Sequence, residues 1–203
     1  MPRLITSHDV RFKLSLGNVD TFISAADDAT EEATLHLAAD LRTSLVRATY
    51  EDVWLLDNYD STSALMKLQL RAGFVDAATV QIGTGYTMAD ATADTSLTAL
   101  AAVGYEKGQV TITEGVLYKY VSVRYEAGFP LITDDPDELL DLTLAPAWLA
   151  EAAMAKAVSV MASHPEFSRK EGTALDGKAY ARQYASLVAP RIRYLPGFRV
   201  PTV

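Results

Sequence analysis

The sequence predicts an α+β protein with a long N-terminal helix, a small antiparallel β-sheet or hairpin, an Ala-rich second helix, and a C-terminal helix followed by an extended arm. Three observations support this fold class. Apolar residues recur at helical spacing in residues 20–48, 146–163 and 173–189. Short runs between the first two segments alternate apolar and polar residues, as half-buried strands do. Proline punctuates residues 190–203, which favours an extended segment there.

Composition narrows the class of protein. Hydrophobic residues make up 49% of the 203 residues, which is enough to bury a core. The absence of cysteine excludes disulfides, thiol catalysis and thiolate zinc sites. The first residues lack the continuous apolar core of a signal peptide, and no long charge-free apolar run occurs. We therefore expect a soluble protein that is not bound to a membrane.

Charge is distributed unevenly along the chain. Residues 1–164 hold 11 basic and 23 acidic residues, a net charge of −12, whereas residues 165–203 hold seven basic and three acidic residues, a net charge of +4. An acidic body argues against a protein that grips nucleic acid, because phosphate contacts need positive surface. The basic end suggests a different partner for the tail, with an incidental imbalance as the alternative.

Residues 20–48 are predicted as an amphipathic helix. Acidic residues precede Arg42 and Arg47, which suits the helix dipole. The apolar positions are three or four residues apart: Phe22, Ile23, Ala26, Ala33, Leu37, Leu41 and Leu45.

Strands are expected after this helix. The strand-like runs are residues 51–57, 66–74 and 78–82. Residues 83–104 are rich in Ala, Thr and Gly and show little periodicity, so we expect an extended loop with a helical turn near 97–102. Residues 109–113 and 116–125 are predicted to pair as a hairpin around Glu114-Gly115.

The second strand of that hairpin ends in the stretch YKYVSVRYEAGFP, residues 118–130. Large side chains on both faces predict a central strand, or one whose outer face meets another subunit. Gly128 is expected to adopt a backbone conformation that other residues resist, and Phe129 to cover the edge of the core. A plain surface turn is the alternative.

The C-terminal part is predicted to be helical and then extended. Pro146 stands at the favoured first position of an Ala-rich helix, and a third helix follows over 173–189. The final segment, RIRYLPGFRVPTV, carries aromatic and basic residues that can dock in a partner's groove. Its proposed docking residues are Arg191, Arg193, Tyr194, Phe198 and Arg199, and a frayed terminus is the alternative.

Patterns of catalytic or metal-binding residues are weak. His8, His36 and His164 have no second histidine at ligand spacing, and the carboxylates of residues 27–32 lack the Glu-x-x-His partner of carboxylate-bridged metal sites. The acidic residues of 134–141 lack calcium-loop spacing, and the GTG at 83–85 is not a nucleotide loop. We predict no catalytic residue, no metal and no cofactor.

Two motifs in this layout resemble those of the head–tail connector (adaptor, or head-completion) proteins of tailed bacteriophages. The first is a strand and turn of the form V-x-Y-x-A-G, formed here by Val123, Tyr125, Ala127, Gly128 and Phe129. The second is the start of an Ala-rich packing helix, with Pro146, Trp148 and Leu149. The resemblance covers most of residues 1–164, so we expect a connector-like domain over 1–164 and a helix with a docking arm over 165–203.

The resemblance implies a structural virion protein at the head–tail interface and not an enzyme. It implies a homo-oligomeric ring, expected as a dodecamer, that binds the portal protein and a tail or tail-completion protein. DNA would pass through the channel without sequence-specific binding, and an acidic wall suits that passage. The alternative is a soluble monomeric α+β enzyme or small-molecule binder with a disordered tail.

Overall fold

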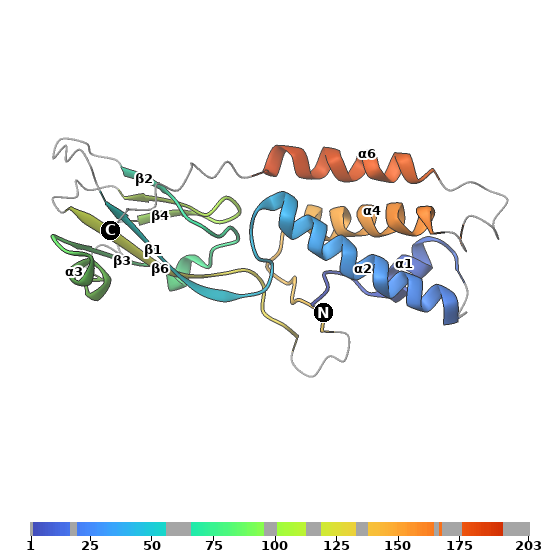
Figure 1. Cartoon of the computed structure of the whole chain (residues 1–203), viewed down its shortest axis with the longest axis horizontal. Helices are drawn as coiled ribbons and strands as arrows, with labels where there is room; N and C mark the ends of the chain where they lie inside the picture. The colour runs from blue at the N-terminus through green and yellow to red at the C-terminus, as the bar shows by residue number, and fades with distance from the viewer. Residues whose placement is uncertain are drawn as a thin grey trace. The chain divides into compact units, whose positions relative to one another are not determined.

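The computed structural model describes residues 2–16, 20–55, 66–95, 101–112, 119–132, 138–164, 167 and 176–192, and it has the α+β fold predicted from the sequence (Figure 1). The chain divides into two compact units. A helical unit combines residues 1–42 with 129–192, and a β unit holds residues 43–128. This division differs from the expected boundary at residue 164, because the β unit is inserted between helices and the last helix belongs to the helical unit.

The helical unit contains α1 (Ser7–Lys13), α2 (Asp20–Leu41), α4 (Ala147–Ser163) and α6 (Gly177–Val188), followed by the short 3-10 turn η3 (Ala189–Arg191). Helix α4 packs against both α2 and α6, and α1 packs against α2 (Figure 1). Four of the eight buried residues of α4 are alanines, which lets its two neighbours approach closely. The Ala-rich segment is therefore the central helix of this unit.

Helix α2 buries the face that the sequence predicts. Its buried apolar residues are Phe22, Ala25, Ala26, Ala29, Ala33, Leu37 and Leu41. The helix ends at Leu41, earlier than predicted, because Arg42 adopts a left-handed conformation with φ 52°. That position usually carries glycine or asparagine, so an arginine gives the sequence no stop signal there.

The N-terminal segment is tied to α2 by polar contacts. The Arg3 guanidinium donates to Asp27 Oδ1 at 2.8 Å and to Glu31 Oε1 at 2.7 Å. The Leu4 backbone N–H donates to Thr34 Oγ1 at 3.2 Å, inside the core. Two of the α2 carboxylates therefore anchor a chain segment, and the desolvated ion pairs hold the pKa of Arg3 above its ordinary value even though burial opposes it.

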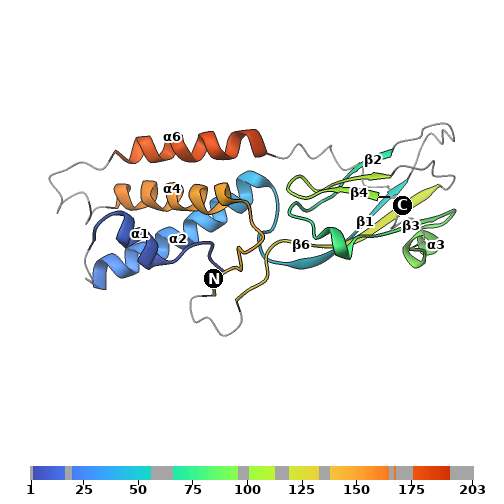
Figure 2. The same ribbon diagram turned by 180° about the vertical axis from the view of Figure 1, so that it is seen from behind.

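The β unit contains two three-stranded antiparallel sheets. One has the order β1 (Ala48–Leu55), β6 (Tyr120–Ala127), β3 (Gln81–Gly85), and the other has the order β2 (Met66–Gln69), β5 (Gln109–Ile112), β4 (Ala101–Gly104). A single buried cluster draws on both sheets, including Leu68, Val110, Ile112, Ile82, Val121 and Val123. The unit also contains the turn η1 (Ala77–Thr79) and the helix α3 (Met88–Ala93), which is seen beside β3 in Figure 2.

Two predictions for this unit were wrong. Strands β5 and β6 do not form a hairpin with each other, because each pairs with two strands of its own sheet. Residues 83–104 are not an extended loop, since their described part holds the end of β3, the helix α3 and the strand β4. The predicted helical turn near 97–102 is contradicted at Ala101 and Ala102, which lie in β4, and residues 96–100 lie outside the described residues.

Candidate interaction surfaces

The predicted strand-and-turn motif lies where the chain leaves the β unit. Val123, Tyr125 and Ala127 point into the buried cluster from β6, which is the central strand of its sheet. Gly128 has φ 93°, and a Cβ at this position would stand 2.6 Å from the Val46 carbonyl oxygen. Phe129 is buried in the helical unit. Glycine is therefore required at 128 for two reasons, its backbone conformation and the close approach of another chain segment.

The buried carboxylate of Asp52 links strands β1 and β6 to the Arg71 backbone within the β unit. Asp52, on β1, accepts a hydrogen bond from the Tyr125 hydroxyl at 2.7 Å and another from the Arg71 backbone N–H at 2.7 Å. Tyr125 in turn accepts from the Ala72 backbone N–H at 3.0 Å and stacks on Tyr50. Burial raises the pKa of the Tyr125 phenol, and its bond to Asp52 raises it further. All these groups have partners, which is the pattern of a structural network.

The two glycines of the GTG motif, Gly83 and Gly85, let helix α3 pack directly against strand β3. A Cβ on Gly83 would stand 2.0 Å from the Asp94 carbonyl oxygen, and a Cβ on Gly85 would stand 2.6 Å from the Ala91 backbone nitrogen. The α3 backbone therefore lies directly on the outer face of β3. The Thr87 hydroxyl and the Asp90 carboxylate cap the helix reciprocally. The motif has a packing role here, as its poor match to a nucleotide loop suggests.

Of the three packing residues predicted at the start of α4, two are buried as expected, and Pro146 lies one position before the predicted one. Trp148 and Leu149 are buried within the helical unit. Pro146 is the residue just before the helix, at the N-cap position, instead of the predicted first helical position. No side chain caps this end, so Pro146 contributes its extended backbone geometry alone.

Arg191 belongs to the helical unit and not to a free arm. Its guanidinium lies 4.4 Å from the centroid of the Trp148 ring, and it donates to the Leu187 carbonyl oxygen at 2.5 Å. These contacts anchor the end of α6 on the start of α4. The other proposed docking residues, Arg193, Tyr194, Phe198 and Arg199, lie outside the described residues.

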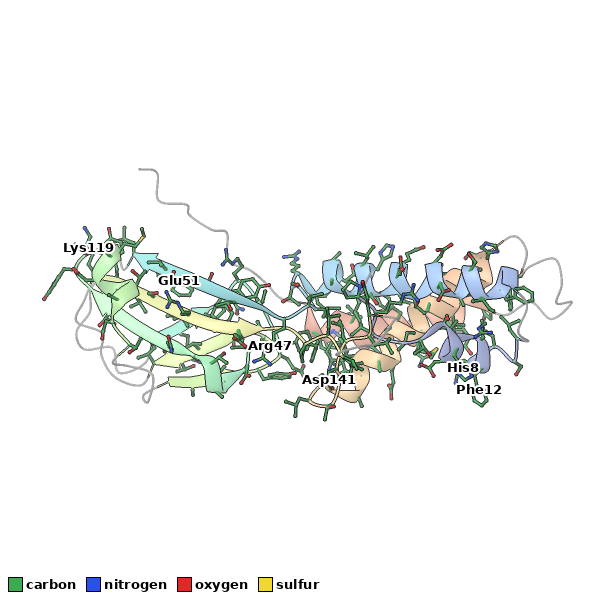
Figure 3. All side chains as sticks on the ribbon, turned by 90° about the horizontal axis from the view of Figure 1, so that it is seen from below. His8, Phe12, Arg47, Glu51, Lys119 and Asp141 are labelled. Atoms are coloured by element: carbon green, nitrogen blue, oxygen red, sulfur yellow. The ribbon has the colours of Figure 1, made fainter. Side chains whose placement is uncertain are left out.

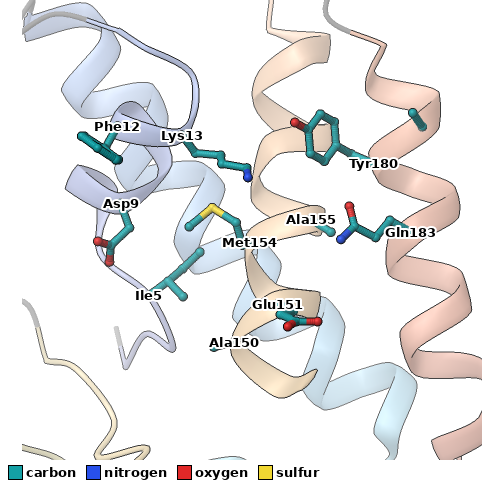
Figure 4. A pocket seen from close by; sticks show the side chains of 11 residues that line it. Ile5, Asp9, Phe12, Lys13, Ala150, Glu151, Met154, Ala155, Tyr180 and Gln183 are labelled. Atoms are coloured by element: carbon teal, nitrogen blue, oxygen red, sulfur yellow. The ribbon is translucent and has the colours of Figure 1, made fainter. Parts of the chain in front are cut away.

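A groove runs over α4 between α1 and α6 (Figure 4). Its volume is about 940 Å³, and Ile5, Met154 and Ala155 contribute apolar lining. Phe12 stands at one wall with 80% of its surface exposed, stacked on His8 (Figure 3). Charged side chains at the groove are Asp9, Lys13 and Glu151. An exposed phenylalanine beside an apolar groove is typical of a surface that another molecule covers.

Features that would point to other functions are scarce in the described part of the chain. It contains no group of three or more His, Asp or Glu side chains placed to hold a metal ion. None of the helices described there is long and apolar enough to cross a membrane. The groove over α4 has both apolar and charged lining, and it lies wholly within the helical unit.

Sequence reasoning missed the helix α1 and the groove beside it. The signal for α1 was present: Thr6 and Asp9 form a reciprocal capping box at its start, and the same Thr-x-x-Asp spacing opens α3. The groove had no comparable signal, because its residues come from three segments far apart in the sequence.

Comparison with known proteins leaves the family open. No protein-family model matches the chain, and no curated protein sequence matches it. The fold class stands on the structure itself, and function rests on the geometry of the surfaces described above.

Proposed function

We propose that this chain is a head-to-tail adaptor of a tailed bacteriophage, a structural virion protein that forms a ring below the portal and extends the DNA channel toward the tail. One observation carries the proposal. The motif from Val123 to Phe129 ends at a left-handed glycine and returns the chain into a helical unit whose centre is the Ala-rich helix α4. This strand, turn and helix follow in the order that the connector resemblance implies.

Charge supports a role around DNA. The first 164 residues have a net charge of −12, and the whole chain has −8. An acidic channel wall repels phosphate, so DNA can slide through it without being held. A basic wall would bind the duplex non-specifically and resist its passage.

The arm is the proposed contact with the portal protein. Arg193, Tyr194, Phe198 and Arg199 combine cationic and aromatic side chains, the residue types that carry most binding energy at interfaces. Because Arg191 is stacked on Trp148, we assign it to anchoring the base of the arm and the remaining four residues to docking.

The experiment for this proposal is a portal-binding assay with the portal protein that the proposal implies as the partner. A variant truncated after Ile192 keeps the Arg191–Trp148 contact and should retain its fold by circular dichroism while losing portal binding. Substitution of Tyr194 and Phe198 by alanine in the full chain should weaken binding, and substitution of Arg193 and Arg199 by glutamate should weaken it most at low salt. Unchanged co-assembly of the truncated chain would refute the docking role.

A monomeric small-molecule binder or enzyme is the second candidate, and the groove over α4 is the observation that favours it. Such a protein would stay monomeric with and without portal protein. Native mass spectrometry distinguishes the two candidates, because an adaptor that assembles only on its template still forms rings when portal protein is present.

A further inference from the structure

Helix α6 lies beside α4 and buries little of its own surface (Figure 1). Val188 is its one buried residue, whereas α4 buries eight of its seventeen residues. The exposed residues of α6 are Lys178, Ala179, Ala181, Arg182, Gln183, Ala185 and Ser186. Because the hydrophobic stabilisation of a contact scales with the apolar area removed from water, α6 is held less firmly than α4.

The seam between α6 and α4 is narrow. A Cβ on Gly177 would stand 2.9 Å from the Ala162 Cβ, so the two helices approach closely at that point. The groove over α4 lies along part of the seam. A second hollow of about 590 Å³ is lined by both helices, through Ser159, Ala162, Ser163, Asp176, Gly177, Lys178 and Ala181. Small side chains with hollows beside them leave little apolar contact to hold α6 in place.

Two side-chain contacts fasten the C-terminal half of α6. The Tyr184 hydroxyl donates to Asp40 Oδ2, near the end of α2, at 2.5 Å, and Lys156 Nζ lies 5.8 Å from the centroid of the Tyr184 ring. Arg191, in η3 directly after α6, lies 4.4 Å from the centroid of the Trp148 ring. The first contact joins α6 to α2 and the second joins its end to α4, so both break when α6 leaves the unit.

We propose that α6 is a releasable helix, fastened by the Tyr184–Asp40 and Arg191–Trp148 contacts, and that a partner bound to residues 193–203 releases it from α4. An isolated helix of twelve residues is marginal in water, so α6 unfolds when it leaves α4. Release uncovers the alanine-rich side of α4 against which α6 packs.

The link to a partner runs through Arg191. Only Ile192 separates Arg191 from the arm, so movement of the arm away from α4 breaks the Arg191–Trp148 contact. This coupling rests on the proposed adaptor function, in which the portal protein binds the arm. The release of α6 in the chain alone does not depend on that function.

Amide hydrogen exchange of the full-length chain, measured alone, tests the release. Amides of α6 should exchange at least about ten-fold faster than those of α2 and α4, because α6 opens without the rest of the unit. Tyr184→Phe should speed exchange in α6 about a further ten-fold, and Arg191→Ala about three-fold, with α2 unchanged. Arg182→Ala, at an exposed position of the same helix, is the matched control and should change nothing. Equal exchange in α6 and α4, or equal effects of Tyr184→Phe and Arg182→Ala, would overturn the proposal.

The coupling is tested with portal protein. Portal binding should speed exchange in α6, and Tyr184→Phe should tighten portal binding by up to the factor by which it promotes release, because coupling between two equilibria is reciprocal. Unchanged or slower exchange in portal-bound chain, or portal binding that Tyr184→Phe leaves unchanged or weakens, would overturn the coupling while leaving the adaptor proposal standing. Failure of the full-length chain to bind portal protein would refute the adaptor proposal and the coupling together, whereas the release is judged by exchange in the chain alone.

Discussion

Removal of the Asp52 carboxylate should destabilise the β unit strongly. The Asp52 side chain is 3% exposed and accepts hydrogen bonds from the Tyr125 hydroxyl and the Arg71 backbone N–H, each at 2.7 Å. Hydrogen bonds to a charged acceptor contribute about 1.5–3 kcal/mol each. The ion pair to the half-exposed Arg71 side chain adds less than about 1 kcal/mol. Asp52→Ala should therefore lower the free energy of unfolding by about 3–5 kcal/mol.

A second variant shows whether the network acts as a unit. Tyr125→Phe removes one of the two bonds to Asp52 and leaves the Ala72 backbone N–H without its acceptor, so we expect a loss of about 2–3 kcal/mol. The Asp52→Ala, Tyr125→Phe double variant should lose less than the sum of the single variants, by about 1–3 kcal/mol.

The assay is urea denaturation followed by tryptophan fluorescence. The chain has two tryptophans, Trp54 in the β unit and Trp148 in the helical unit. In a Trp148→Phe background, Trp54 reports unfolding of the β unit alone. Glu51→Ala is the matched control, because that neighbouring carboxylate is exposed and pairs with Arg124 at 3.3 Å, a contact worth at most about 1 kcal/mol. Equal effects of Asp52→Ala and Glu51→Ala, or strict additivity in the double variant, would refute the reasoning.

Three further predictions follow from close contacts and from tyrosine ionisation. Gly83→Ala should lift α3 from the sheet at a cost of about 1–3 kcal/mol in the free energy of unfolding and speed amide exchange in α3. Gly104→Ala is the control and should be nearly neutral, because the nearest atom to its added Cβ stands at 3.5 Å. Equal amide exchange in both variants would contradict the close packing of α3 on β3. Gly128→Ala should cost at least about 1–2 kcal/mol in urea denaturation because of its positive φ, and a neutral result would exclude the close approach to Val46. Burial raises the pKa of Tyr125 and Tyr184 in the folded protein. The stability that each contributes is therefore complete below the unfolded pKa of about 10 and falls as pH rises above it. Tyr184→Phe should flatten that decline in thermal melts between pH 8 and 11, and an unchanged slope would contradict the raised pKa of Tyr184 in the folded protein.

The sequence predicted the longer helices α2, α4 and α6, because their signal is local, and it missed the short helices α1 and α3. In α2, Ala26, Ala33 and Leu37 repeat at helical spacing and all are fully buried. The alanines of α4 likewise mark a helix that packs on two sides. The early end of α2 was missed, since nothing in the identity of Arg42 marks a left-handed residue.

The strand pairing could not be predicted in the same way. Strands β2, β4 and β5 are four residues long, so alternation within each is a weak signal. Residues 109–113 and 116–125 were predicted as a hairpin because they are neighbours in sequence, yet the strands described within them, β5 and β6, lie in different sheets. Asp52 stands between Val53 and charged Glu51 in a half-exposed strand, and its burial is explained by two donors distant in sequence, the Tyr125 hydroxyl and the Arg71 backbone N–H.

The candidate surfaces also differ in how far the sequence predicts them, because some are local in sequence and others are assembled by tertiary packing. Val123, Tyr125 and Ala127 of the motif share strand β6, and Gly128 and Phe129 follow it directly in the chain, so the sequence could identify them together. The groove is lined by residues of α1, α4 and α6. It depends on tertiary packing, which sequence spacing does not report.

Native mass spectrometry of the full-length chain, alone and mixed with the portal protein that the adaptor proposal implies, tests the central claim most directly. The adaptor account predicts a complex in which a closed ring of this chain, expected as a dodecamer, is bound to the portal ring. A chain that remains strictly monomeric in both samples, with no portal-bound species, would contradict it.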